Sequence, residues 1–383
     1  MTLDIFQRLL VPSLHSITFA GFGEPLLNNA LFDMIELARD KLPRIRISLN
    51  TNGTKIDENI AEKLAQSVET VAISIDGASP ETYNEIRQGS DFSELMGKVR
   101  ILNKFKKRTK METGFAFTAT KKNIEELPKL IELAHECSMN FIIVSNLLPH
   151  TEIMRDQILY DSNSEEAVIL FNKLKAEAHK KNLDLSMYPK CITEPRKDRR
   201  IIVKIYERAI SEAVDRGFDL NFSNLMKKDE NTLAHAIEIF REAKSKASRY
   251  GVKLSLPRII PRTKRECVFV KDRSVFVSWN GYVRPCNQLM HSYPCYINGR
   301  SKNVSSISFG NVMEQDLMEI WRSKKYAEFR VKVKKFQFPP CGDCTFQDRC
   351  DYINREEFRY DCYTNEQPCG DCLWARGILQ CMR

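Results

Sequence analysis

The uneven distribution of cysteine constrains this chain more than any other feature of its sequence. Of the twelve cysteines in 383 residues, only Cys137 and Cys191 precede Cys267. The others lie between Cys267 and Cys381, in a stretch that we expect to be rich in loops. Thiols in such a region are typical of disulfides in secreted proteins and of metal sites elsewhere. The N-terminal sequence MTLDIFQRLL has no signal-peptide pattern. We therefore predict a cytoplasmic protein whose thiols bind metal.

The spacing of these cysteines supports a metal site. Two tight pairs, Cys341–Cys344 and Cys369–Cys372, both read C-G-D-C, and a C-x-x-C pair places two thiolates on one metal centre while distant cysteines complete its ligands. The spacing does not separate iron–sulfur clusters from zinc, and it leaves disulfides or a redox dithiol open. The predicted metal ligands are Cys267, Cys286, Cys341, Cys344, Cys350, Cys362, Cys369, Cys372 and Cys381.

Residues 1–150 alternate between apolar strands and amphipathic helices. This alternation predicts βα units with right-handed crossovers and a parallel sheet that is buried on both faces. An open sheet and a closed or partial barrel are both compatible with it. The predicted strands are 16–20, 44–49, 71–75, 115–118 and 141–144.

Two further regions follow, so that the predicted domains are 1–150, 151–262 and 263–383. The middle region is charged and helical, and residues 171–189 resemble residues 240–257 as a helix, a turn and a short strand. This echo is either chance or a local duplication in which one copy supplies the last strand of the sheet. The last region is predicted to hold short strands at 275–277 and 281–283 and one helix over 314–333.

Small polar residues and glycine follow three successive predicted strands. The segments are Gly21-Phe-Gly-Glu-Pro25, Asn50-Thr-Asn-Gly53 and Ser74-Ile-Asp-Gly77. Parallel βα folds bind ligands at the carboxyl ends of their strands, so these segments predict one binding site. Within it, the Glu24 carboxylate can accept hydrogen bonds from an ammonium group.

These segments resemble the radical S-adenosylmethionine (SAM) enzymes that carry a SPASM-type auxiliary-cluster domain. Residues 21–25 are similar to the GGEP motif, which in that family binds the methionyl amino group of SAM. The resemblance implies an α/β fold: a partial parallel (βα)6-type radical SAM barrel, a helical insertion and a small cysteine-rich iron–sulfur domain. The SAM-binding residues that it implies are Gly21, Gly23, Glu24, Pro25, Asn50, Asn52, Ser74, Asp76 and Ser145.

The cysteine series from Cys267 to Cys350 is similar to the first part of the SPASM pattern, which implies two auxiliary 4Fe-4S clusters. The chain departs from this pattern at one position. SPASM domains place a cysteine four residues after the equivalent of Cys350, where this chain has Asn354. We expect Cys362 or Cys295 to take its place.

A second departure concerns the cluster that cleaves SAM. Family members hold that cluster with a C-x-x-x-C-x-x-C loop before GGEP, whereas no cysteine precedes Cys137 here. We expect the first barrel strand and its cluster loop to be missing, with Met1 an internal methionine. The residues given should then not cleave SAM by themselves.

Segments such as 144–150, 338–341 and 368–375 resemble a narrower group, the radical SAM maturases associated with tungsten-containing oxidoreductases. This implies reductive SAM cleavage and hydrogen abstraction from a tungsten/pterin cofactor or its host oxidoreductase. The implied electron donor is a ferredoxin or flavodoxin. The alternatives are a peptide-modifying enzyme of the sulfatase-maturase kind, a non-catalytic iron–sulfur module and a zinc-stabilised scaffold.

Charge and hydropathy indicate no further partner. The net charge is +9, from 59 Lys and Arg against 50 Asp and Glu, and basic runs such as 104–108 are typical of solvated helix ends. No nucleic-acid-binding module accompanies them, so nucleic acid is not expected as a partner. No window of about 18 apolar residues is present, so no membrane span is expected.

Overall fold

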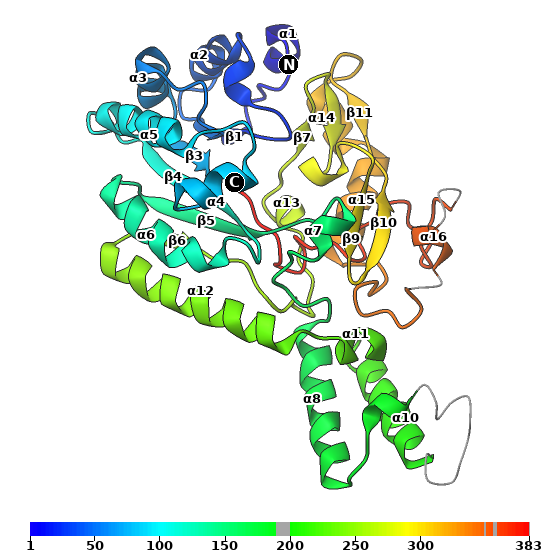
Figure 1. Ribbon diagram of the computed structural model, residues 1–383. Coiled ribbons are helices and arrows are strands. Elements are labelled where there is room, and N and C mark those ends of the chain that lie inside the picture. Colours follow the sequence, from blue (N-terminus) through cyan, green and yellow to red (C-terminus); the bar gives the residue numbers. More distant parts are fainter. Residues whose placement is uncertain (189–199, 348–349, 355–357, 383) are drawn as a thin grey trace.

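A six-stranded parallel sheet organises the first part of the chain. The computed structural model describes residues 1–188, 200–347, 350–354 and 358–382 (Figure 1). The strands pair in chain order, β1 to β6, and within the described residues no pairing joins β6 to β1. The sheet is thus an open, partial barrel. Its strands are β1 (Ser16–Phe19), β2 (Arg46–Thr51), β3 (Thr70–Ser74), β4 (Glu112–Ala119), β5 (Phe141–Asn146) and β6 (Lys253–Ser255).

The five predicted strands are confirmed, with small shifts of their ends. Leu49, Val71, Phe115 and Val144 of neighbouring strands are all fully buried, as expected for a sheet that is covered by crossover helices. The register pairs Leu49 with Val71, so the carboxyl ends of these strands lie at one edge. The three polar strand-end segments therefore lie side by side.

Helices follow most of the strands. Several begin at an acidic N-cap, which accepts a hydrogen bond from an otherwise unpaired backbone N–H. Asp57 accepts from the backbone N of Ile60 at 2.8 Å, and Asp91 accepts from the backbone N of Glu94 at 2.8 Å. The elements are α1 (Leu3–Gln7), η1 (Pro25–Leu27), α2 (Leu31–Lys41), α3 (Glu58–Ser67), α4 (Pro80–Ile86), α5 (Phe92–Lys106), η2 (Ile124–Glu126) and α6 (Leu127–Glu136).

The middle region forms a helical arm that projects away from the sheet (Figure 1). The arm has its own apolar core, in which Phe171, Tyr206 and Phe222 are buried. The long helix α12 returns from the arm and packs on α6, with Lys246 and Glu132 paired at 2.7 Å. The elements are α7 (Glu152–Arg155), α8 (Glu165–Lys180), η3 (Leu185–Met187), α10 (Arg200–Asp215), α11 (Phe222–Met226) and α12 (Glu230–Tyr250).

The two echoed segments take different structures. The second one supplies β6, the last strand of the sheet. The prediction of a strand in the first one is wrong: residues 185–187 form η3. Asp184 caps this turn by accepting from the backbone N of Ser186 at 2.8 Å, a local bond that competes with strand pairing. Pro189, which ends the first segment, lies outside the described residues.

The cysteine-rich region holds two small antiparallel sheets and short helices. The single helix predicted over 314–333 is two helices, α14 and α15, because Ser323 ends the first and caps the second through the backbone N of Tyr326. The domain limits stay predictions. The elements are α13 (Val268–Lys271), β7 (Phe276–Val277), β8 (Tyr282–Arg284), η5 (Asn287–Leu289), β9 (Tyr293–Ile297), β10 (Arg300–Val304), β11 (Gly310–Asn311), α14 (Leu317–Arg322), α15 (Lys324–Lys334) and α16 (Asp351–Asn354).

Candidate functional site

The loop after β1 is tied to the end of β2 by Glu24. One oxygen of the Glu24 carboxylate accepts from the Thr51 hydroxyl at 2.7 Å and from the backbone N of Leu26 at 3.1 Å. The other oxygen accepts from the backbone N of Asn52 at 2.7 Å. These bonds hold residues 21–25 in place. Pro25 is the first residue of η1, where its missing N–H costs nothing.

The glycines of this loop leave room for a ligand. Gly21 has a φ of +146°, which side chains rarely adopt, and a Cβ there would lie 3.7 Å from the Phe276 ring. A Cβ on Gly23 would meet no atom within 4 Å, so its backbone faces open space. Beside the loop, the Asn50 side-chain oxygen is buried without a hydrogen-bond partner. A buried acceptor of this kind indicates a missing polar group, such as a donor from a bound ligand.

Asn52 and Asp76 are already engaged. The Asn52 side-chain oxygen accepts from the backbone N of Thr54 at 3.0 Å. The Asp76 carboxylate binds Arg87 at 2.9 Å and accepts from the backbone N of Thr118 at 2.8 Å, so it joins the ends of β3 and β4. Ser74 ends β3 at the same edge and is partly exposed.

Ser145 contacts the C-terminal tail of this chain. Its hydroxyl accepts from the backbone N of Gln380 at 3.3 Å, and the Gln380 amide donates to the Ser255 carbonyl at 3.0 Å. Next to it, the Asn146 amide donates to the carbonyl of Ile378 at 3.0 Å. The tail therefore fills the edge of the sheet at β5 and β6. Sequence reasoning missed Gln380, because no motif marks it.

The cysteine-rich region also contacts this edge. Besides the approach of Phe276 to Gly21, the rings of Phe22 and His291 lie 5.8 Å apart, and those of His150 and Tyr293 lie 5.1 Å apart. The strand-end site is thus bordered by residues that follow Cys267. His150 and His291 therefore lie where the parallel-sheet region and the cysteine-rich region meet.

Four cysteines from distant parts of the cysteine-rich sequence form what we call the first thiol group: Cys267, Cys286, Cys369 and Cys372. Burial raises the pKa of Cys286, and the nearby thiols of Cys372 and Cys267 raise it further. Burial also raises the pKa of Cys372 to about 12, with Cys267 the next cause. Cys267 and Cys369 pack against one apolar cluster that contains Tyr326 and Phe329.

Four other cysteines form the second thiol group: Cys341, Cys344, Cys350 and Cys362. Burial raises the pKa of Cys341 to about 12, with a smaller contribution from Cys344. The pKa values of Cys344 and Cys362 are also raised by burial, and the Cys350 thiol adds to both. The two groups abut, because a Cβ on Gly370 would lie 2.7 Å from the Cys341 sulfur.

Buried cations lie beside both thiol groups. Asp371 pairs with Arg300 at 3.0 Å and with Lys302, and all three side chains are at most 5% exposed. Asp343 of the other C-G-D-C pair binds Arg376 at 3.2 Å, also buried. Arg300 and Lys302 also lower the pKa of Cys341 against the stronger effect of burial. The aspartate inside each of the two C-G-D-C pairs, Asp343 and Asp371, was the sequence signal that could have revealed this network.

The described thiols do not form a site for a single metal ion. Within the described ranges, no three His, Cys, Asp or Glu side chains are grouped to hold one metal ion. In an iron–sulfur cluster each thiolate binds a different iron, so the ligands stand further apart than around one ion. Cys295 is buried in β9 opposite Lys302, and Cys381 follows the tail residue Gln380.

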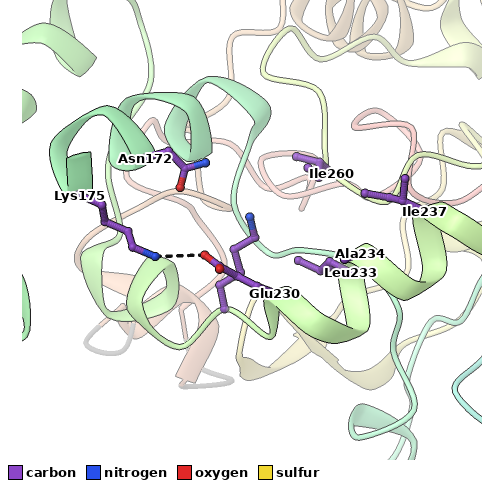
Figure 2. A pocket seen from close by; sticks show the side chains of 8 residues that line it. Asn172, Lys175, Glu230, Leu233, Ala234, Ile237 and Ile260 are labelled. Atoms are coloured by element: carbon purple, nitrogen blue, oxygen red, sulfur yellow. Dashed lines mark hydrogen bonds and ion pairs between the residues drawn. The ribbon is translucent and has the colours of Figure 1, made fainter. Parts of the chain in front are cut away.

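The cavity between α8 and α12 is a different feature. It has a volume of about 420 Å³ and contains the ion pair of Lys175 and Glu230 at 3.2 Å (Figure 2). None of the sequence-predicted site residues lines it. It therefore contributes nothing to the strand-end site.

Comparison with known families agrees with the site. Residues 3–134 match the Radical SAM superfamily, and residues 267–345 match SPASM, an iron–sulfur cluster-binding domain. The chain belongs to the radical SAM enzymes that carry a SPASM domain. SAM and iron–sulfur clusters are the cofactors of these two domains. None of the described helices is both long and apolar enough to cross a membrane.

The chain is similar to the tungsten-containing aldehyde ferredoxin oxidoreductase cofactor-modifying protein of Pyrococcus furiosus, with 27% identity over 100% of this chain and 88% of that protein. It is 34% identical to the AdoMet-dependent heme synthase of Methanosarcina barkeri over 30% of this chain and 32% of that protein. Among solved structures, native anSMEcpe with bound AdoMet has a TM-score of 0.47 and 18% identity, covering 90% of this chain and 76% of that one.

Proposed function

We propose that this protein acts in the maturation of a tungsten-containing oxidoreductase, on its tungsten/pterin cofactor or on the oxidoreductase that carries it. The single observation that carries the proposal is the similarity to the Pyrococcus furiosus cofactor-modifying protein, which extends over 100% of this chain. Both thiol groups lie in the part of the chain that this similarity includes. A ferredoxin or flavodoxin is the expected electron donor.

We propose that SAM binds at the strand-end edge. The open backbone at Gly23 and the unpaired Asn50 oxygen support this site, because they offer space and an acceptor to an ammonium group. The Glu24 carboxylate has the role of a positioning residue, since it already accepts three hydrogen bonds that fix the loop. Ser145 and Asp76 fix neighbouring chain segments. Phe22 and His291 border the site.

We propose that each thiol group holds one auxiliary 4Fe-4S cluster. In the second thiol group, Cys362 takes the place of the cysteine that SPASM domains have at the position of Asn354. A bound cluster supplies electron transfer when all four thiolates are ligands. The chain's own residues offset the negative charge of such a centre, because Arg300 and Lys302 are buried next to Cys341 and Asp371.

The SAM-cleaving cluster does not fit the described residues in the same way. It needs three thiolates, and Cys137 is the only described cysteine before Cys267. Cys137 follows α6 and precedes β5, at the amino end of the sheet. The described residues therefore do not supply the three ligands of that cluster.

The test of the maturation role is selective binding of the partner. The full chain, purified without oxygen, is incubated with a tungsten oxidoreductase and, separately, with short cysteine- or serine-containing peptides of the kind that sulfatase maturases modify. We expect a stable complex with the oxidoreductase and none with the peptides. Binding to peptides alone contradicts the proposal and favours a peptide-modifying enzyme.

The ligand sets are tested by substitution and iron analysis. Cys369→Ser and Cys362→Ser should each lose about half of the bound iron, about four of eight atoms. They should remove different signals from the electron paramagnetic resonance spectrum of the reduced protein. Cys295→Ser is the matched control and should keep all iron. About two zinc atoms and no iron in the protein would show a zinc scaffold instead.

A further inference from the structure

We propose that the outer face of α15 is the docking surface for an acidic electron-transfer protein that exchanges electrons with the first thiol group. This inference rests on the proposed assignment of a cluster to that group. It adds where the electron donor binds on this chain, and that the donor is recognised by its acidic surface. We call this surface the α15 face and define it by Lys324, Lys325, Val331, Lys334 and Lys335.

The α15 face is strongly basic, with four lysines against one acidic residue of the helix. All four of its lysines are exposed, and none forms an ion pair within the described part of the chain. Glu328 is the one exposed acidic residue of the helix. Val331 lies among these residues and is 51% exposed, which gives the face an apolar centre. A basic rim around an apolar contact is suited to a partner with an acidic surface.

The opposite side of α15 contacts the first thiol group. Tyr326, Phe329 and Val333 are buried and belong to the apolar cluster against which Cys267 and Cys369 pack. α15 also packs on α13, which begins directly after Cys267. One helix diameter, about 10 Å, therefore separates a partner on the α15 face from the thiols.

Aromatic side chains fill that short distance. The Tyr326 and Phe309 rings stack with their centroids 4.1 Å apart, and the Phe329 ring lies 5.2 Å from the Phe309 ring. The guanidinium of Arg330 lies 4.5 Å from the Tyr326 ring and adds a cation beside it. A partner that binds here gives up one electron, and no bond forms or breaks and no proton moves.

Another basic stretch of the chain lacks these properties. In the run 104–108, Lys104 pairs with Glu58 at 3.1 Å, and Lys106 donates to the hydroxyl of Thr113 at 3.1 Å. That run ends α5, on the helical cover of the parallel sheet, where no cysteine of either thiol group lies. Positive charge alone therefore does not select the α15 face, whereas charge combined with contact to the thiols does.

The test is binding of an oxidised, acidic 2Fe-2S ferredoxin to the full chain, measured by calorimetry. The variant carries Lys324→Gln, Lys325→Gln, Lys334→Gln and Lys335→Gln. The matched control loses the same charge at four exposed lysines on other helices: Lys129→Gln, Lys180→Gln, Lys204→Gln and Lys244→Gln. We expect the α15 variant to raise Kd about tenfold at low salt. We expect the control to change it less than about twofold, because its charges are distant.

Two further measurements separate the possible outcomes. With iron-loaded protein, the rate of reduction by the reduced ferredoxin should fall about tenfold in the α15 variant, while reduction by dithionite stays unchanged. Equal Kd values for the variant and the control overturn the proposal. So does a loss of affinity for duplex DNA or anionic vesicles without a loss for ferredoxin. If the protein holds no iron, the cluster assignment fails, and the Kd comparison still decides whether the α15 face binds the acidic protein.

Discussion

Replacing Asp371 by asparagine tests the buried charges beside the thiols. Asp371, Arg300 and Lys302 are 1%, 5% and 4% exposed, and Arg300 lies 3.0 Å from the carboxylate. At that distance and an effective dielectric constant of about 20, two unit charges attract by about 5.5 kcal/mol. Asparagine keeps the shape and removes the charge, which leaves two buried cations without a counter-ion. Since breaking a buried pair costs about 3–5 kcal/mol, we expect the iron-free protein to lose about 4 kcal/mol.

The assay is urea unfolding of iron-free protein, with the free energy of unfolding taken from the midpoint and slope. Asp156→Asn is the control: its side chain is 73% exposed, its pairing with Arg155 at 3.6 Å is solvated, and it should cost less than about 1 kcal/mol. Adding Lys302→Met to Asp371→Asn removes one unpaired cation and should recover part of the loss.

Iron loading should reduce the cost of Asp371→Asn, because a four-thiolate cluster carries negative charge that replaces the carboxylate. A loss below about 1 kcal/mol in iron-free protein, with an unchanged slope, would refute the reasoning. So would an equal loss with and without iron. Either result would mean that the two cations are solvated when the protein is in solution.

Three further changes test other parts of the structure. Gly370→Ala places a Cβ 2.7 Å from the Cys341 sulfur, so we expect the second thiol group to lose iron when the content is measured after anaerobic reconstitution. Glu24→Gln removes the charge that holds the loop after β1, so we expect SAM to bind about tenfold more weakly in equilibrium dialysis, since hydrogen bonds to charged groups are worth about 1.5–3 kcal/mol. Glu177→Gln tests a pH dependence: hydrogen bonds from Lys181 and Arg208 lower the pKa of Glu177 in the fold. Its stabilising effect is therefore present above the unfolded pKa of about 4.3 and is lost as the pH falls through the folded value. The Tm difference between wild type and Glu177→Gln should accordingly be larger at neutral pH than in acid.

These three predictions have clear controls and contrary results. Gly97→Ala meets no atom within 4 Å and should keep full iron, whereas equal iron in Gly370→Ala would contradict the packing argument. Unchanged SAM affinity in Glu24→Gln would show that the loop holds its shape without the charge. A Tm difference that stays constant from neutral to acid pH would show that Glu177 contributes no charge-dependent stability.

Hydrophobic patterning was enough to find the parallel sheet. The strands around Leu49, Val71 and Phe115 are apolar on both faces, and that signal is local. The break at Ser323 was missed because apolar periodicity continues across it, while the break depends on one side-chain cap. The strand predicted near Leu185 does not form, because the Asp184 side chain caps a local turn, whereas strand pairing would need a distant partner strand.

The candidate site shows the same limit. The segments around Glu24 and Asn50 were found because each follows its own strand. Cys369 belongs to the thiol group of Cys286 and not to that of Cys341 because of how loops far apart in the sequence pack together. The spacing of the cysteines does not encode that packing. The partners of Asp371 likewise come from β10, about 70 residues earlier in the chain, so no short motif could reveal them.

The attachment of residues 378–380 to β5 and β6 also fixes the order in which this edge of the sheet is completed. The ribosome makes Gln380 and Ile378 long after Ser145 and Asn146, the residues to which they bind. In a nascent chain, the edge at β5 and β6 consequently stays incomplete until residues 378–380 have been made.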